Sequence, residues 1–283
     1  MRGLMNRPLA AVMACMFAAS VSIFFVAGAM ADELDAFQGL EGRLDIAGGT
    51  AHIPVMTDAA KRIMRANPRI RITVAGGGSG VGVQKVGQGL VDVGNTGRPL
   101  SDEERKKFKL VSFPFAIDGV AVIVHPSNRV AGLTAKQAQD IFAGKISNWK
   151  DVGGADRAIH LYNRDEASGT RAVFWKKLLE KGEMSTKSNV VPSNGAMKVA
   201  VGGDADAIGY LSIGYVDQSV SAVAIDGVAA SQEKAQDGTY QVVRKLYMNT
   251  KGEPSKLARA FIDYICGDAG AQFIKDAGYI PLK

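Results

Sequence analysis

The sequence has little of what several common kinds of functional site require. Among its 283 residues are only two cysteines, Cys15 and Cys266, and three histidines, His52, His125 and His160. Two cysteines cannot build a disulfide framework, and these five residues lack the spacing of a metal site. Gly-Lys-Ser and Gly-Lys-Thr occur nowhere, which excludes a Walker nucleotide-binding loop. We therefore expect no metal ion and no cofactor.

The composition excludes further classes of protein. The chain is 47% hydrophobic and 22% charged, which is typical of globular proteins and excludes disorder and coiled coil. Lys and Arg total 34 against 28 Asp and Glu, a net charge of +6. The run at residues 102–107 mixes both signs and contains no aromatic residue, which is typical of a solvated helix face rather than a nucleic-acid platform. We expect no nucleic-acid partner.

Residues 1–31 have the pattern of a secretory signal peptide. Arg2 and Arg7 precede an apolar stretch, and the Ala-Met-Ala tripeptide at 29–31 offers a small-residue cleavage pattern before two acidic residues. We expect cleavage after Ala31 and a periplasmic mature protein. A retained membrane anchor stays open as an alternative, because an apolar stretch of roughly 20 residues can span a bilayer.

In the rest of the chain, short apolar segments of strand type alternate with segments of helical period. This alternation predicts an α/β fold with parallel strands. Strands are expected at residues 43–47, 70–75, 90–94, 159–162, 207–211, 220–225 and 242–248, and an apolar stretch at 111–124 is interrupted by Asp118-Gly119. Helices are expected at residues 53–66, 81–89, 134–142, 168–180, 257–266 and 269–277. Cys266, on the first of the two closing helices, is expected to be buried as a small apolar side chain.

Two segments are candidates for crossings between two lobes. Residues 113–119 look like a crossover, and the strand expected at 242–248 follows a turn and would return to the first lobe. We therefore expect one lobe formed by residues 32–115 together with 240–283, and a second lobe formed by residues 116–239.

Three loops share one design, in which a glycine-bearing loop with a hydroxyl residue follows a strand and opens a helix. They are Gly48-Gly49-Thr50, Gly76-Gly77-Gly78-Ser79-Gly80 and Ala167-Ser168-Gly169-Thr170. The free N–H groups and the positive dipole at a helix N-terminus favour an anion. One such loop alone is more simply a helix N-cap. Three of them, with Arg164 nearby, predict a site for one tetrahedral oxyanion, because a guanidinium can bond such an ion bidentately.

An enzyme is the alternative from a different class. A secreted phosphatase or esterase could use Ser79 or Ser168 as its nucleophile. It would need a base or a metal ion beside the serine, and the sequence contains neither in recognisable form. A nucleophile elbow around Ser79 would also need glycine at the position of Val81. We therefore expect no catalytic residue.

Several motifs together resemble the periplasmic phosphate-binding proteins of ABC phosphate importers. They occur in the family's order over nearly the whole mature chain: Gly49-Thr50-Ala51 with Pro54, Gly78-Ser79-Gly80, DVGNTGRPL at 92–100, FAGKISNW at 142–149 and RDEASGT at 164–170. The resemblance implies an α/β, two-lobed periplasmic-binding-protein fold of type II, hinge-linked, with the ligand between the lobes. It also implies that the protein is not an enzyme. Its partners would be inorganic phosphate and the membrane permease subunits of an ABC importer, and such a receptor is most simply a monomer.

The same resemblance implies which residues bind the anion. They are Thr50, Ala51, Ser79, Arg164, Ser168, Gly169 and Thr170, with Gly80, Thr96 and Gly97 as further candidates. Glu166 matches an acidic position that steadies the arginine. One position departs from the family, since some members have an aspartate that accepts the phosphate proton, and others a serine, where this sequence has Gly97. A buried acceptor distinguishes protonated phosphate from ionised sulfate, and the Thr96 hydroxyl is the candidate substitute.

Two further functions fit the same pocket. The chain could be a receptor for another tetrahedral oxyanion, such as sulfate, molybdate or tungstate, although the motif at residues 164–170 favours phosphate. It could also be a phosphate sensor or scaffold that is not coupled to transport. The sequence does not separate this alternative from an importer receptor, because both need the same pocket.

Overall fold

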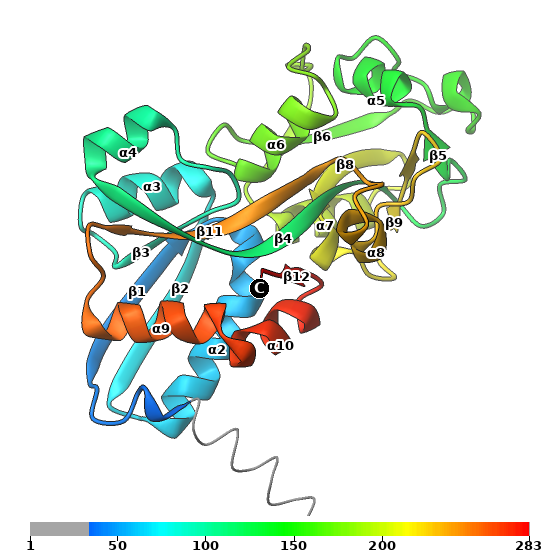
Figure 1. Ribbon diagram of the computed structural model, residues 1–283. Helices are drawn as coiled ribbons and strands as arrows, with labels where there is room; N and C mark the ends of the chain where they lie inside the picture. The colour runs from blue at the N-terminus through cyan, green and yellow to red at the C-terminus, as the bar shows by residue number, and fades with distance from the viewer. Residues whose placement is uncertain (1–33, 283) are drawn as a thin grey trace, which may run out of the picture.

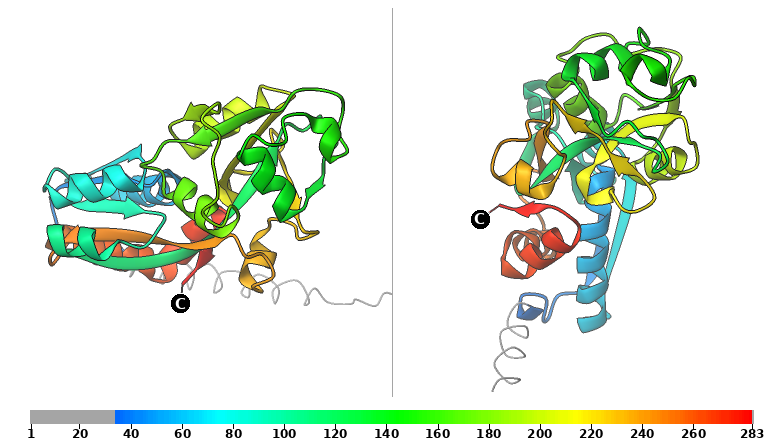
Figure 2. Two further views of the ribbon diagram at one scale, coloured as in Figure 1. Left: turned by 90° about the horizontal axis from the view of Figure 1, so that it is seen from above. Right: turned by 90° about the vertical axis from the view of Figure 1, so that its right-hand side faces the viewer.

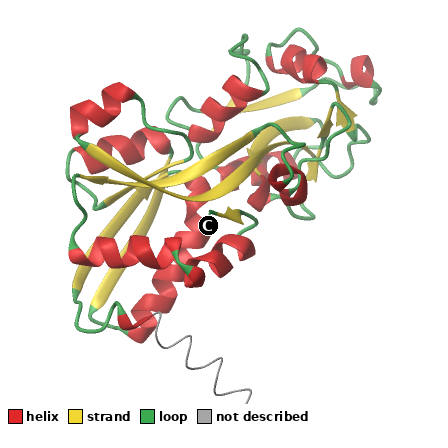
Figure 3. Cartoon of the chain, in the orientation of Figure 1, coloured by secondary structure: helices red, strands yellow, loops and turns green. Residues whose placement is uncertain are grey.

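Residues 34–282 are described by the computed structural model, and the predicted signal peptide lies outside them. Helices and strands alternate along this part of the chain, as expected for an α/β fold (Figures 1 and 3). The strands are β1 (Gly42–Gly48), β2 (Ile70–Gly77), β3 (Val93–Thr96), β4 (Leu110–Val124), β5 (Gly132–Leu133), β6 (His160–Arg164), β7 (Asn189–Val191), β8 (Ala207–Ser212), β9 (Ser221–Ala222), β10 (Ala224–Ile225), β11 (Val243–Lys251) and β12 (Ile280–Pro281). The helices are η1 (Thr50–His52), α2 (Ile53–Ala66), α3 (Ser79–Gly87), α4 (Asp102–Phe108), α5 (Ala135–Phe142), η2 (Trp149–Val152), α6 (Gly169–Lys177), α7 (Asn194–Gly202), η3 (Ile213–Tyr215), α8 (Gln232–Gln236), α9 (Lys256–Cys266) and α10 (Asp268–Asp276).

Most strands of the described chain join one continuous sheet. Its main order is β2-β1-β3-β11-β4-β8-β6-β7, while β9 and β12 each pair with β4. β1 is parallel to β2 and β3, and β6 is parallel to β7 and β8. β4 and β11 are antiparallel to their neighbours. The sheet therefore consists of two parallel halves joined by one antiparallel pair.

β4 and β11 form the connection between the two halves. They pair along residues 110–119 and 243–251, and Figures 1 and 2 show both ribbons passing from one half into the other. β4 continues through Asp118 and Gly119, where the sequence suggested an interruption. It can continue because Asp118 lies opposite Arg244 on β11, which pairs with its carboxylate.

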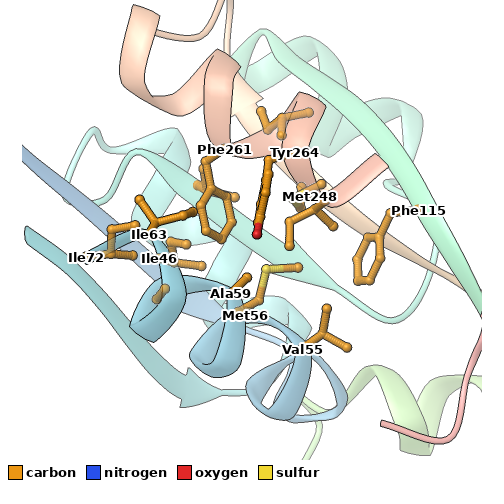
Figure 4. Close-up of a cluster of buried hydrophobic side chains, with 14 of the residues drawn as sticks. Ile46, Val55, Met56, Ala59, Ile63, Ile72, Phe115, Met248, Phe261 and Tyr264 are labelled. Carbon is orange, nitrogen blue, oxygen red and sulfur yellow. The ribbon is translucent and has the colours of Figure 1, made fainter. Parts of the chain in front are cut away.

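Each half packs around its own apolar core. In the first, α2 turns the buried residues Val55, Met56, Ala59 and Ile63 toward α9, where Phe261 meets them (Figure 4). Their spacing of three and four residues puts them on one helix face. α3 covers the opposite face of the same strands through a separate cluster.

The second half is built around three aromatic rings. Phe174 of α6 stacks on Tyr210 of β8 with ring centroids 4.0 Å apart, and Phe142 of α5 packs edge-on against Phe174. α7 covers the other face of β8 through Met197 and Val201. Because separate cores form on either side of the β4–β11 crossing, the fold is two-lobed, as the resemblance implied. The lobe limits in residue numbers stay a prediction.

Local predictions differ from the structure in a few places. The helix expected at residues 53–66 has those bounds in α2, whereas α6 ends at Lys177 and not at residue 180. Cys266 is exposed, contrary to the expected burial, because it is the last residue of α9 and follows the apolar positions that face the core. Within residues 34–282, no helix combines the length and apolar character needed to cross a membrane.

Candidate functional site: an anion pocket between the lobes

The three glycine-bearing loops meet at one pocket between the lobes. η1, α3 and α6 begin there at Thr50, Ser79 and Gly169, after the ends of β1, β2 and β6. The N–H of Gly80 donates to the carbonyl of Ala167 at 2.9 Å, so loops from opposite lobes are in contact. The cavity has a volume of only about 10 Å³, far below that of sites for drug-sized ligands. It is lined by Gly49, Thr50, Ala51, His52, Gly78, Ser79, Gly97, Arg164, Ser168, Gly169, Thr170 and Arg244.

Two serine hydroxyls in this wall already accept a hydrogen bond from the protein. Ser79 Oγ accepts from the N–H of Gly97 at 2.9 Å. Ser168 Oγ caps α6 by accepting from the N–H of Arg171 at 3.1 Å. Since each hydroxyl has one proton to donate, these contacts orient the lone pairs toward the protein and leave the proton for a ligand. The first N–H groups of η1 and α6 have no partner within their helices and add further donors, whereas in α3 the N–H of Gly80 already donates to the Ala167 carbonyl.

Arg164 brings a buried positive charge to the pocket. It is the last residue of β6 and is only 2% exposed. Nε donates to the carbonyl of Val191 and Nη2 to that of Pro192, both at 3.0 Å, which fixes the guanidinium plane. Among the described residues, no carboxylate lies within ion-pair distance of it. Burial lowers the pKa of Arg164. Because a buried cation without a counter-ion is costly, the site favours an anion.

Arg244 is a second buried guanidinium in the same wall. It lies opposite Asp118, and its Nε and Nη2 are 2.8 and 2.7 Å from Asp118 Oδ2. Its Nη1 donates to Thr170 Oγ1 at 3.0 Å. Burial raises the pKa of Asp118, and the ion pair with Arg244 opposes that effect. Arg244 also explains why residue 97 is a glycine, because a Cβ at that position would lie 2.6 Å from Arg244 Nη1. The guanidinium occupies the space that a side chain at position 97 would need.

His52 lies between the pocket and the sheet and is fully buried. Its ring packs edge-on against Phe115, with centroids 5.4 Å apart, and its Nε2 is 3.2 Å from the carbonyl of Tyr247. Burial, reinforced by the positive charge of Arg244, lowers the pKa of His52 to about 3. The ring is therefore neutral at physiological pH.

Asn194, the first residue of α7, links the two lobes beside the pocket. Its N–H and its Nδ2 donate to Thr50 Oγ1 at 3.2 and 3.1 Å. Its Oδ1 accepts from the N–H of Ser212 at 3.3 Å and lies 3.5 Å from Arg164 Nη1. The hydroxyl of Tyr215 also donates to the carbonyl of Thr50, at 2.7 Å. These bonds run from the second lobe to the first, so this is a closed arrangement.

Most of the residues expected at the site lie in the pocket wall. They are Thr50, Ala51, Ser79, Gly97, Arg164, Ser168, Gly169 and Thr170. Gly80 is outside the wall, because the Ala167 carbonyl takes its N–H. Thr96 is also outside it: side chains alternate along β3, and its hydroxyl accepts from Asn249 Nδ2 at 3.1 Å. Thr96 is therefore not placed to accept a proton from a ligand.

The expectation that Glu166 orients Arg164 is wrong. The Glu166 side chain is 93% exposed, and its nearest cationic group is Arg171 Nη1 at 4.0 Å. Backbone carbonyls of the β7–α7 connection orient Arg164 instead.

Sequence reasoning missed three residues of the site. His52 directly follows the predicted pair Thr50 and Ala51, so its place in the same turn was a usable signal. The sequence signal for Arg244 was weaker: it is an arginine within a strand that was expected to be apolar. No sequence signal pointed to Asn194, because its contact with Thr50 joins residues that are 144 positions apart.

The fold and site place the chain in a broad class of binding proteins. A family model described as a PBP superfamily domain matches residues 35–269, which is most of the described chain. Two lobes with an anion pocket between them agree with that match.

Comparison with individual proteins identifies the family within this class. The chain is 37% identical over 244 residues to the phosphate-binding protein PstS of Bacillus subtilis, covering 85% of this chain and 81% of that one. It is 28% identical to PstS of Pseudomonas aeruginosa, with coverage of 86% and 84%. A solved substrate-binding protein from Clostridium perfringens, assigned to a phosphate ABC transporter and holding phosphate, superposes with a TM-score of 0.81 at 34% identity, covering 86% of this chain and all of that one. The chain belongs to the PstS family of phosphate-binding proteins. It is accordingly a binding protein and not an enzyme.

Proposed function

We propose that this chain binds inorganic phosphate in the pocket between its lobes and delivers it to the permease of an ABC importer. The observation that supports this most strongly is the buried guanidinium of Arg164, which has no carboxylate partner in the described chain and faces a wall of hydrogen-bond donors. The relatives support phosphate as the anion, since they are phosphate-binding proteins and one of them holds phosphate.

The proposed contacts divide into charge, backbone and hydroxyl groups. Arg164 bonds two oxygens of the ion through its planar fork. Backbone N–H groups come from the first turns of η1 and α6, and hydroxyl protons come from both lobes. The proposed binding residues are Thr50, Ala51, Ser79, Arg164, Ser168, Gly169 and Thr170, joined by Gly97 and Arg244 in the wall. A charge-assisted bond contributes about 1.5–3 kcal/mol, so the arginine dominates this set.

We also propose that binding is coupled to closure of the lobes. One lobe consists of residues 32–115 with 240–283, except that Tyr240 and Val242 pack in the core of the other lobe, which residues 116–239 form. The hinge lies where β4 and β11 cross between the lobes. Phosphate stabilises the closed state by bonding both lobes at once. The mature protein acts in the periplasm as a monomer after removal of residues 1–31.

Replacing Arg164 tests the proposed function. Arg164→Met keeps an unbranched side chain but removes the charge and its donors, so phosphate affinity measured by calorimetry should fall by at least about 10-fold. Arg105→Met is the matched control, because Arg105 is exposed on α4. Unchanged phosphate binding in a folded Arg164→Met variant would contradict the proposal, and so would an equal loss in the control.

A further inference from the structure

A second group of polar side chains lies away from the anion pocket, where β6 and β8 begin. His160 is the first residue of β6, and Asp204 and Asp206 lie in the turn that leads from α7 into β8. One imidazole nitrogen and one oxygen from each carboxylate lie within 4.8 Å of one another. No other group of three His, Cys, Asp or Glu side chains among residues 34–282 comes this close. We call these three residues the β6–β8 triad.

The backbone brings the members of the triad together. β6 pairs with β8 at His160 and Ala207. The N–H of His160 donates to the carbonyl of Asp206 at 2.9 Å, and the N–H of Asp206 donates to Asp204 Oδ1 at 3.1 Å. His160 Nδ1 lies 2.8 Å from Asp204 Oδ2. The imidazole and both carboxylates therefore meet because two adjacent strands start at this point.

Donors outside the triad orient both carboxylates. The Tyr162 hydroxyl donates to Asp204 Oδ2 at 3.1 Å, and Arg157 Nη2 donates to Asp206 Oδ2 at 2.7 Å. Metal-binding side chains in proteins are commonly held by such outer hydrogen bonds. The side chains of Asp204 and Asp206 are only 22% and 14% exposed, whereas that of His160 is 49% exposed. The triad is therefore a fixed set of ligands with one side open to solvent.

We propose that the β6–β8 triad binds a divalent transition-metal ion, of which Zn²⁺ is the best match. Zn²⁺ bonds imidazole nitrogen and carboxylate oxygen at about 2.0–2.2 Å, and three protein ligands leave it a position for water. Ca²⁺ and Mg²⁺ are poorer matches, because they prefer oxygen ligands and do not use the imidazole. Two ionised carboxylates also balance the charge of a divalent ion.

Two surface ion pairs explain the same contacts without a metal ion, namely His160 with Asp204 and Arg157 with Asp206. Exposed pairs of this kind contribute little to stability. Arg157 is 57% exposed, so its guanidinium can turn into solvent when an ion binds Asp206. The two explanations differ in one measurable respect, because only a metal site makes the folded protein more stable when Zn²⁺ is added.

The spacing of residues in the sequence does not indicate this site. His160 and Asp204 are 44 positions apart and come together through the pairing of β6 with β8. The expectation of no metal ion was based on cysteines and histidines, whereas the triad combines one histidine with two aspartates. The proposal does not depend on phosphate binding, since Arg164 lies at the other end of β6.

Calorimetric titration with zinc chloride tests the proposal. The mature protein is used without a histidine tag, at pH 7, in a phosphate-free buffer that does not chelate zinc. We expect one site with a dissociation constant of about 10 μM or below, and binding at least about 10-fold weaker in His160→Gln and in Asp206→Asn. His125→Gln is the matched control and should keep the wild-type affinity, because His125 Nδ1 contacts the Ser127 hydroxyl, outside the triad.

Thermal unfolding provides a second readout. Zn²⁺ at about ten times its dissociation constant should raise the Tm of the wild type and of His125→Gln by about 2–5 °C and leave that of His160→Gln unchanged. The proposal is overturned if the wild type binds no zinc, if His160→Gln binds zinc as tightly as the wild type, or if His125→Gln loses as much affinity as His160→Gln. A wild type that binds zinc in this way but binds no phosphate would support the triad and contradict the proposed function.

Discussion

At the scale of single residues, the pocket is defined by how its charges are compensated. Arg164 is held by carbonyl oxygens and has no counter-ion in the described chain, whereas Arg244 is held by Asp118. Both guanidinium groups are buried, but only the first leaves a full charge for a ligand. Arg244 adds donors without adding net charge, because Asp118 compensates its guanidinium, so the pocket contains one uncompensated cation rather than two.

Position 97 has room only for glycine, because the Arg244 guanidinium occupies the space that a side chain there would need. We expect Gly97→Ala to push the Arg244 guanidinium aside, because the new Cβ would lie 2.6 Å from Nη1. Phosphate affinity should fall by about 10-fold or more as the donors of the wall move. Gly132→Ala is the control, since the nearest atom to a Cβ there is 3.8 Å away. Titration of both variants with phosphate measures the effect, and equal affinities would mean that Gly97 does not make room for Arg244.

At the scale of elements, the closed arrangement depends on hydrogen bonds that cross between lobes. Tyr215 of η3 donates to the Thr50 carbonyl of η1 at 2.7 Å, and Asn194 of α7 donates to the Thr50 hydroxyl. Burial raises the pKa of Tyr215 to about 12, so its hydroxyl remains a donor at neutral pH. These elements lie on either side of the β4–β11 crossing, so the bonds form only when the lobes meet.

Tyr215 and Tyr240 each donate a hydrogen bond to a backbone carbonyl, and replacing each by phenylalanine gives a matched test of lobe closure. Tyr215→Phe removes a bond between lobes and should weaken phosphate binding about 2- to 10-fold, as expected for a bond of about 0.5–1.5 kcal/mol that forms on closure. Tyr240→Phe removes a bond to the Val120 carbonyl within the second core, at 2.6 Å, and should lower the Tm without changing phosphate affinity. Calorimetry and thermal unfolding distinguish the two, and identical behaviour of the variants would argue against a role for Tyr215 in closure.

At the scale of the whole molecule, the sequence predicts the fold better than it predicts the complete site. The α/β alternation and the three helix-opening loops are local patterns, so α2, the three turns that line the pocket and Arg164 could all be identified. Arg244 and Asn194 come to the pocket only through the long antiparallel crossing and through α7. Thr96 and Glu166 were assigned to the site from their positions in sequence motifs. The side chain of Thr96 bonds Asn249 instead, because side chains alternate along β3. The side chain of Glu166 is exposed to solvent.

The central claim is that the closed pocket binds phosphate and distinguishes it from sulfate. The most direct test is a calorimetric titration of the mature wild-type protein, freed of bound anion by unfolding and refolding, with phosphate and with sulfate at pH 7. The account predicts a phosphate dissociation constant of about 1 μM or below and sulfate binding at least about 10-fold weaker. Comparable affinities for the two anions would contradict the selectivity, and the absence of phosphate binding would contradict the function.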